Sequence, residues 1–216
     1  VDNAFKEKCV HVPLTEQPAY NGARLIHSKV IASYLRQLLR NDLQYAPFRM
    51  EGMEQDVREM MEIDTPQGKL ALQIGGTIDR LDSKGDTLRI VDYKPGGTPK
   101  TPENIEQLFT PADNRPNYIF QTFLYAAILC RKQSLKVAPS LLYIHRAASE
   151  SYSPVIEMGA PRQPKVPVNN FAFFEDEFRE RLHGLLQEIF SQEETFSQTE
   201  DTRKCEYCDF RSLCKR

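Results

Sequence analysis

The fold of this chain is decided by two stretches, Gly-Thr-Ile-Asp-Arg-Leu-Asp at residues 76–82 and Ile-Val-Asp-Tyr-Lys at residues 90–94. Apolar residues alternate with smaller or polar ones from Leu70 to Leu81, which predicts a strand, and Gly75-Gly76 predicts a kink or bulge within it. Residues 83–86 (Ser-Lys-Gly-Asp) are typical of a turn, and residues 87–93 are rich in β-branched and aromatic residues. We therefore predict that the two runs pair as a β-hairpin.

Charged side chains are expected to converge at the end of this hairpin. Asp79 closes the first strand, and Asp92 and Lys94 lie two residues apart on the second, so both point to the same face. Two carboxylates on a sheet that must also bury a core are costly unless they are compensated, and a divalent cation is a natural compensator. The alternative is a salt-bridged surface hairpin with no site.

The ordered motifs resemble the PD-(D/E)XK nucleases of the RecB and AddB branch. They are Gly-x-x-Asp-Arg-x-Asp at residues 76–82, a turn, an apolar run ending in Asp-x-Lys at residues 92–94, and Gln-x-x-x-Tyr at residues 121–125. The resemblance covers most of residues 22–214. It implies an α/β fold with a restriction-endonuclease-like core, a mixed central β-sheet flanked by helices, and a C-terminal cysteine-rich segment.

Length and composition limit the possible classes. A chain of 216 residues with 40% hydrophobic content buries one sizeable core, and a single α/β domain is favoured. The formal net charge of −2 means that a DNA-binding surface must be a local basic patch. No long apolar run and no basic-then-apolar leader is present, which predicts a cytoplasmic protein without a membrane partner.

An amphipathic helix is predicted from Gly22 to about residues 41–42, because apolar residues recur at helical spacing. His27 shares a face with Ile31 and Tyr34, so we expect it to point inward, where a histidine is commonly a core residue. The resemblance implies another role. RecB-like nucleases carry a Gly-x(3 or 4)-His signature on an early helix, and Gly22-x4-His27 matches it, so the resemblance implies that His27 is a metal ligand.

A second helix is predicted to begin at Pro116, after a long irregular segment that follows Lys94. Gln121 and Tyr125 are one turn apart on its apolar stripe, where a packing role is the alternative to a role beside the metal. Pro95 departs from the family, in which a hydroxyl residue commonly follows the lysine. It holds Lys94 extended but removes a backbone donor.

The remaining elements are predicted as follows. Residues 49–57 form a strand, Ser140 to His145 form a buried strand with residues 152–158 as its partner, and His145 is structural. Residues 159–168 form a loop, and a third amphipathic helix spans residues 171–190. This organisation predicts a lead-in at residues 1–20, a nuclease domain at residues 21–196 and a cysteine-rich segment at residues 197–216.

The C-terminal cysteines have the spacing C-x2-C-x5-C, formed by Cys205, Cys208 and Cys214. Three thiols this close in an odd set of five predict a metal or cluster site rather than disulfides. AddB-like nucleases hold a four-iron iron-sulfur cluster with this spacing plus one upstream cysteine. Cys9 lacks the Cys-Pro context of that ligand, so either Cys9 substitutes or the ligand precedes a fragment, and the fragment is favoured. Cys130 is expected to pack.

The resemblance implies a DNA nuclease that uses Mg²⁺ or Mn²⁺, with an exonuclease favoured over an endonuclease. It implies catalytic roles for Asp79, Asp92, Lys94, Gln121 and Tyr125. It implies metal ligands at His27, Asp79, Asp92 and the carbonyl of Tyr93. The full protein would be an AddB-like subunit that processes double-strand breaks with a helicase-bearing partner. The alternatives are an inactive nucleic-acid-binding domain, which Pro95 favours, and a zinc-binding structural module.

Overall fold

The computed structural model describes residues 2–16, 21–112, 114–149, 151–191, 195 and 197–215. Residues 17–20 of the predicted lead-in, residue 196 at the predicted domain boundary and Arg216 lie outside the described residues. The described elements, in chain order, are α1 (Asp2–Phe5), η1 (Lys6–Val10), α2 (Gly22–Tyr45), β1 (Arg49–Thr65), β2 (Gly68–Lys84), β3 (Thr87–Lys94), η2 (Glu106–Leu108), α3 (Asn117–Cys130), β4 (Lys136–Tyr143), η3 (Ile144–Arg146), β5 (Glu157–Met158), β6 (Val166–Pro167), η4 (Phe171–Phe173), α4 (Glu175–Phe190) and η5 (Thr202–Cys205).

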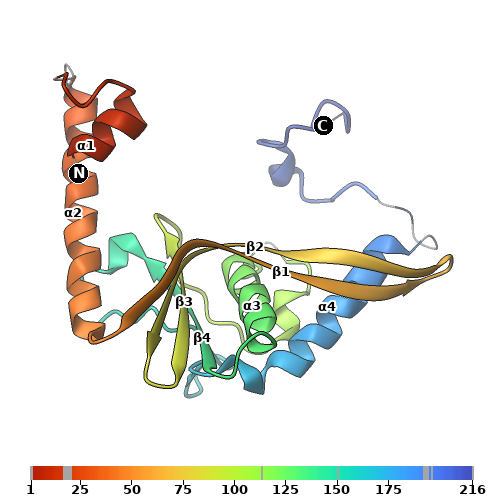
Figure 1. Cartoon of the computed structure of the whole chain (residues 1–216). Helices are drawn as coiled ribbons and strands as arrows, with labels where there is room; N and C mark the ends of the chain where they lie inside the picture. Colours follow the sequence, from red (N-terminus) through yellow and green to blue (C-terminus); the bar gives the residue numbers. More distant parts are fainter. Residues whose placement is uncertain are drawn as a thin grey trace.

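A mixed four-stranded sheet organises the chain, in the order β1-β2-β3-β4 (Figure 1). β1, β2 and β3 pair antiparallel, whereas β4 pairs parallel to β3. The parallel pair arises because α3 carries the chain across the sheet between β3 and β4, as a parallel connection requires. The predicted α/β fold with a mixed sheet flanked by helices is therefore confirmed, as is the hairpin of β2 and β3.

The phenylalanines of α3, η4 and α4 form the centre of the core. Phe123, Phe171 and Phe178 are fully buried, and their ring centroids lie 4.9 to 6.2 Å apart. Aromatic pairs of this geometry add to the free energy gained by burial. They hold α3 and α4 together on one side of the long hairpin of β1 and β2 (Figure 1).

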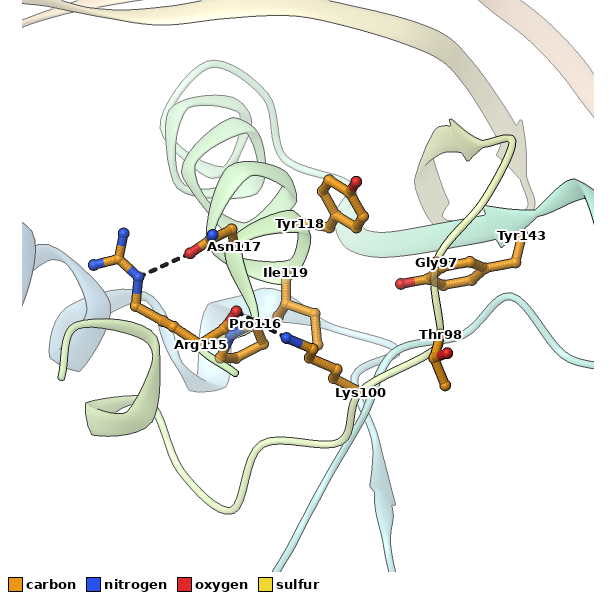
Figure 2. Close-up of a pocket in the computed structure, with 9 residues that line it drawn as sticks. All are labelled: Gly97, Thr98, Lys100, Arg115, Pro116, Asn117, Tyr118, Ile119 and Tyr143. Atoms are coloured by element: carbon orange, nitrogen blue, oxygen red, sulfur yellow. Dashed lines mark hydrogen bonds between the residues drawn. The ribbon is translucent and has the colours of Figure 1, made fainter. Parts of the chain in front are cut away.

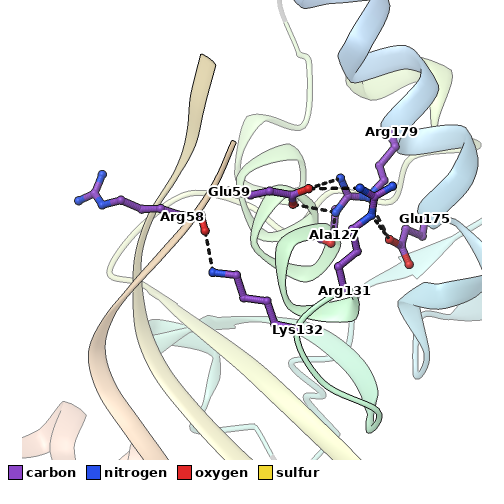
Figure 3. Close-up of polar contacts among 7 residues, drawn as sticks. All are labelled: Arg58, Glu59, Ala127, Arg131, Lys132, Glu175 and Arg179. Carbon is purple, nitrogen blue, oxygen red and sulfur yellow. Dashed lines mark hydrogen bonds and ion pairs between the residues drawn. The ribbon is translucent and has the colours of Figure 1, made fainter. Parts of the chain in front are cut away.

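A polar cluster joins α4 to β1 and α3 (Figure 3). Arg179 of α4 donates hydrogen bonds to Glu59 of β1 at 2.9 and 3.1 Å and to the carbonyl oxygen of Ala127 on α3. Glu175 accepts a further hydrogen bond from Arg179 at 2.9 Å, and Arg131 lies 3.4 Å from Glu59. Because Arg179 is 92% buried, these partners are required to compensate its charge.

Two strand predictions are corrected. Residues 152–158 do not form a full partner strand for β4: on the edge of β4 opposite β3 they contribute a single bridge between Ser140 and Val155, and residues 157–158 pair with β6 instead. The pairing of β1 with β2 continues through Gly75 and Gly76, and its irregularity lies between Met50 and Gly52. Gly75 instead adopts φ +144°, where an added Cβ would collide with the carbonyl oxygen of Val57.

Other predicted elements differ in extent or exposure. β1 continues past residue 57 to Thr65, and the predicted loop at residues 159–168 contains β6. Helix α2 is present, but its apolar stripe is largely exposed and Asn41 is its only buried residue among those described. The helix rises away from the sheet, and α1 lies beside its upper part (Figure 1). Among the described residues, no helix is long and apolar enough to span a membrane.

Candidate active site

The candidate site lies where β2 and β3 separate. Their pairing ends at Arg80 and Val91, and the next positions in this register are Asp79 and Asp92. At this point the Asp79 side chain replaces a backbone partner, because its Oδ2 accepts a hydrogen bond from the backbone N–H of Tyr93 at 2.7 Å. The end of the ladder therefore places two carboxylates beside each other, as the hairpin predicted.

Asp92 and Lys94 form a buried ion pair, with 2.5 Å between Oδ2 and Nζ and only 4% and 13% of the side chains exposed. Burial raises the pKa of Asp92; the ammonium of Lys94 lowers it in part, and the charge of Asp79 raises it further. Within the described residues, Asp92 Oδ2 accepts no well-aligned hydrogen bond. A buried carboxylate that is incompletely satisfied, next to a second carboxylate, fits a divalent cation.

Gln121 and Tyr125 extend this site along α3. Lys94 Nζ donates to Gln121 Oε1 over 3.4 Å, and Gln121 Nε2 donates to the Tyr125 hydroxyl at 2.9 Å. Tyr125 is buried against Gly76, where an added Cβ would lie 2.7 Å from the hydroxyl oxygen. The glycine that begins the first motif thus permits a close approach of the β2 backbone to Tyr125, which in turn fixes the Gln121 amide beside Lys94.

Tyr118 of α3 also belongs to the site, although no sequence motif includes it. Its ring centroid lies 4.3 Å from Lys94 Nζ, and 46% of the residue remains exposed. An ammonium over an aromatic face is attracted by the ring quadrupole. The available signal was its position three residues before Gln121, which puts both side chains on one face of α3.

A second charged network lies next to the site but is paired differently. Asp82 is fully buried and accepts two hydrogen bonds from Arg89, at 2.9 and 2.7 Å. Arg80 lies 2.9 Å from Asp82 and also pairs with Asp42 of α2 at 2.8 Å. Arg80 donates to the Tyr93 hydroxyl at 3.0 Å as well, so this network anchors the end of α2 and the strand that carries Asp92.

The structure does not bring His27 to the carboxylates. His27 lies in the first half of α2 and is exposed, so the expected inward orientation is not observed. Across the described ranges, no three side chains of His, Cys, Asp or Glu are arranged to hold a metal. Asp79 and Asp92 therefore offer two protein side chains to a cation, and the carbonyl of Tyr93 stays a predicted third ligand.

The cysteines are likewise not assembled into a site. Cys205 and Cys214 are partly exposed and Cys208 is exposed, in a segment that lies apart from the sheet (Figure 1). Cys9 is exposed near the start of the chain, and no group with these thiols is arranged for a metal in the part that the structure describes. Cys130 packs against the core, where burial raises the pKa of its thiol to about 11.

Comparison with known protein families gives one match for the chain. The model for the PD-(D/E)XK nuclease superfamily matches residues 1–215, nearly the whole chain. No curated protein matches the sequence.

Proposed function

Because the chain belongs to the PD-(D/E)XK nuclease superfamily, we propose that it hydrolyses phosphodiester bonds in DNA with a divalent metal. The observation that carries this proposal is the buried Asp92 carboxylate, which lies beside Asp79 and is only partly compensated by Lys94. A purely structural ion pair would satisfy its acceptors more completely. A carboxylate that binds a cation is instead expected to have an oxygen atom that accepts no hydrogen bond from the protein.

Asp79 and Asp92 would hold Mg²⁺ or Mn²⁺, which would lower the pKa of a bound water and neutralise the scissile phosphate. Asp79 is oriented for this by the backbone N–H of Tyr93. We also retain the carbonyl of Tyr93 and His27 as further ligands in the proposal, the latter on the strength of the Gly22-x4-His27 resemblance.

Lys94 supplies a fixed positive charge next to the carboxylates. Its ammonium contacts Asp92, Gln121 and the ring of Tyr118, and these contacts define where the charge lies. In hydrolysis the Lys94 ammonium orients the attacking water and stabilises the negative charge that develops on the phosphoryl oxygens. Gln121 and Tyr125 act as positioning residues, since they reach the reaction through Lys94.

The finer proposals rest on the sequence resemblance. We propose that the chain is an exonuclease and part of an AddB-like subunit of a helicase-nuclease, which processes double-strand breaks with a helicase-bearing partner. A cytoplasmic location is proposed separately, because an odd set of five cysteines fits a reducing compartment. A four-iron iron-sulfur cluster at Cys205, Cys208 and Cys214 belongs with the proposals that rest on the resemblance. In the full protein it requires a fourth ligand and a rearrangement of the segment described above.

Two substitutions test the proposed chemistry. Asp92→Asn removes a charged ligand, so both metal affinity and DNA cleavage are expected to collapse. Lys94→Met leaves the carboxylates in place, so metal still binds while cleavage falls about 100-fold or more. A gel assay on linear single- and double-stranded DNA with Mn²⁺, beside calorimetry of metal binding, measures both quantities.

Lys136→Met is the matched control, because Lys136 also pairs with an aspartate, Asp86, but at the exposed end of the sheet. It should cleave like the wild type. If Lys94→Met cleaved DNA as fast as the wild type, the proposed role of the Lys94 ammonium would be wrong. DNA binding without metal-dependent cleavage, in the wild type as in both variants, would show a binding domain instead of an enzyme.

A further inference from the structure

A cavity of about 280 Å³ opens at the carboxyl ends of the parallel strands β3 and β4 (Figure 2). Crevices at this edge of a sheet with parallel strands are common ligand sites. Its wall combines two aromatic rings, two cationic side chains and glycine backbone, supplied by Tyr118, Tyr143, Lys100, Arg115 and Gly97. No acidic side chain is among the described residues that line it.

The two tyrosines differ in what they can do. Tyr143 is 97% buried and forms a fixed wall, whereas Tyr118 is partly exposed and can receive a ligand. Gly97 adopts φ +90°, and a Cβ added there would lie 3.6 and 3.7 Å from the rings of Tyr118 and Tyr143. Glycine therefore suits this position because it keeps the space between the rings free and tolerates the backbone conformation.

The charges of Lys100 and Arg115 are not neutralised by the groups that these side chains contact. Lys100 Nζ donates to the carbonyl oxygens of Asn114 and Arg115, at 2.6 and 3.1 Å, and Arg115 Nε donates to Asn117 Oδ1 at 2.8 Å. These partners are neutral, so they orient the cations without cancelling their charge. Within the described chain, neither side chain forms an ion pair, which favours an anionic ligand.

We propose that this cavity binds the nucleotide next to the phosphate being cleaved, with its base on Tyr118 and its own phosphate at Lys100 and Arg115. The inference rests on the proposed nuclease function. Tyr118 connects the two sites, because its ring contacts the Lys94 ammonium and its side chain also lines the cavity. A base stacked there directs the adjoining backbone to Lys94, and stacking accepts any base because each has a π-face.

The test uses short single-stranded oligonucleotides in which an abasic unit replaces each position in turn. Binding is measured by fluorescence anisotropy without divalent metal, so the result does not depend on cleavage. One abasic position is expected to weaken binding to the wild type by about 5- to 150-fold, the scale of one base–aromatic stack. Tyr118→Ala should bind the intact and that abasic oligonucleotide equally. Phe173→Ala removes an aromatic side chain that is 84% exposed outside the cavity, and should keep the difference.

The phosphate contacts are tested through the salt dependence of binding. Lys100→Met and Arg115→Met should each reduce the steepness of the plot of log affinity against log salt concentration by about 1, the change expected when one phosphate contact is lost. The reduction should be the same for all oligonucleotides. Lys165→Met is the matched control, because Lys165 Nζ also donates to two carbonyl oxygens but lies outside the cavity. Equal slopes for the Lys100 and Lys165 variants would exclude the phosphate contact.

Different results would overturn the nucleotide site and the proposed nuclease function. Equal affinity at every abasic position, or a difference that persists in Tyr118→Ala, would overturn the nucleotide site even if the protein cuts DNA. An abasic effect that Tyr118→Ala abolishes, in a protein that never cleaves, would retain the nucleotide site and reject the nuclease.

Discussion

Asp82 and Asp92 are both buried aspartates paired with a cationic residue of β3, but their surroundings differ in how fully the carboxylate is satisfied. Asp82 receives two hydrogen bonds from Arg89 and contacts Arg80 as well. Asp92 contacts the single ammonium of Lys94, and its Oδ2 accepts no well-aligned hydrogen bond among the described residues. An aspartate paired with a cation of β3 thus forms a structural anchor at one position and the candidate active site at another, ten residues along the chain.

The difference follows from the geometry of the cations and of the strands. A guanidinium presents a planar fork that satisfies both carboxylate oxygens, whereas an ammonium acts as a point charge. Asp82 also lies within the paired region of β2 and β3, while Asp92 lies just beyond its end. A carboxylate oxygen that is free to bind a ligand is therefore expected where the pairing of β2 and β3 ends and the aspartate is paired with a lysine.

Asp82→Asn should give the largest effect in this comparison. It leaves Arg89 and Arg80 with too little negative charge in a buried setting, which should lower the free energy of unfolding by about 3 to 5 kcal/mol. Urea denaturation measures it. Asp86→Asn, which breaks the exposed pair with Lys136, should lower the free energy of unfolding far less, because solvent screens an exposed ion pair. Equal losses in the two variants would show that the Asp82 network is no anchor.

Gly76→Ala should reduce cleavage by about tenfold, because the new methyl group displaces the Tyr125 hydroxyl and loosens Gln121 beside Lys94. Tyr125→Phe is the companion variant, since it keeps the ring and removes only the hydroxyl. Steady-state rates on a labelled oligonucleotide measure both. If Tyr125→Phe cleaves like the wild type while Gly76→Ala does not, the effect comes from displacement of the Tyr125 ring rather than from loss of its hydrogen bond.

Metal affinity should fall on acidification at a higher pH than for an ordinary aspartate, because burial raises the pKa of Asp92 and its protonated form binds metal poorly. Lys94→Met removes an influence that lowers this pKa, so the fall should move to still higher pH. At neutral pH the same variant should bind the cation more tightly, since a like charge has gone. Calorimetry at a series of pH values checks both signs, and a shift to lower pH would contradict them.

His27→Ala should have the smallest effect on stability, within about 0.5 kcal/mol, because the residue is exposed on α2. Its effect on Mn²⁺ affinity decides the proposed ligand role. Unchanged affinity would exclude His27 as a ligand. A clear loss would mean that α2 carries His27 to the carboxylates in the metal-bound protein.

Local patterns predicted the parts of this protein that depend on neighbours in sequence. The alternation in β2, the turn at residues 83–86 and the Asp-x-Lys spacing predicted the hairpin and the contact of Asp92 with Lys94. The stripe on α3 predicted that Gln121 and Tyr125 face one way, which their hydrogen bond confirms. These predictions succeeded because strand and helix periods fix which side chains share a face.

The sequence by itself determined the three long helices, the hairpin of β2 and β3 and the identity of the charged residues at its end. Only the tertiary structure decided that β4 pairs in parallel with β3, that Asp82 is an anchor while Asp92 is left partly unsatisfied, and that Tyr118 joins Lys94 to a cavity. It also left His27 and the cysteines apart from the carboxylates. The physical reason is that pairing, burial and unsatisfied charge depend on residues distant in sequence, which no local period records.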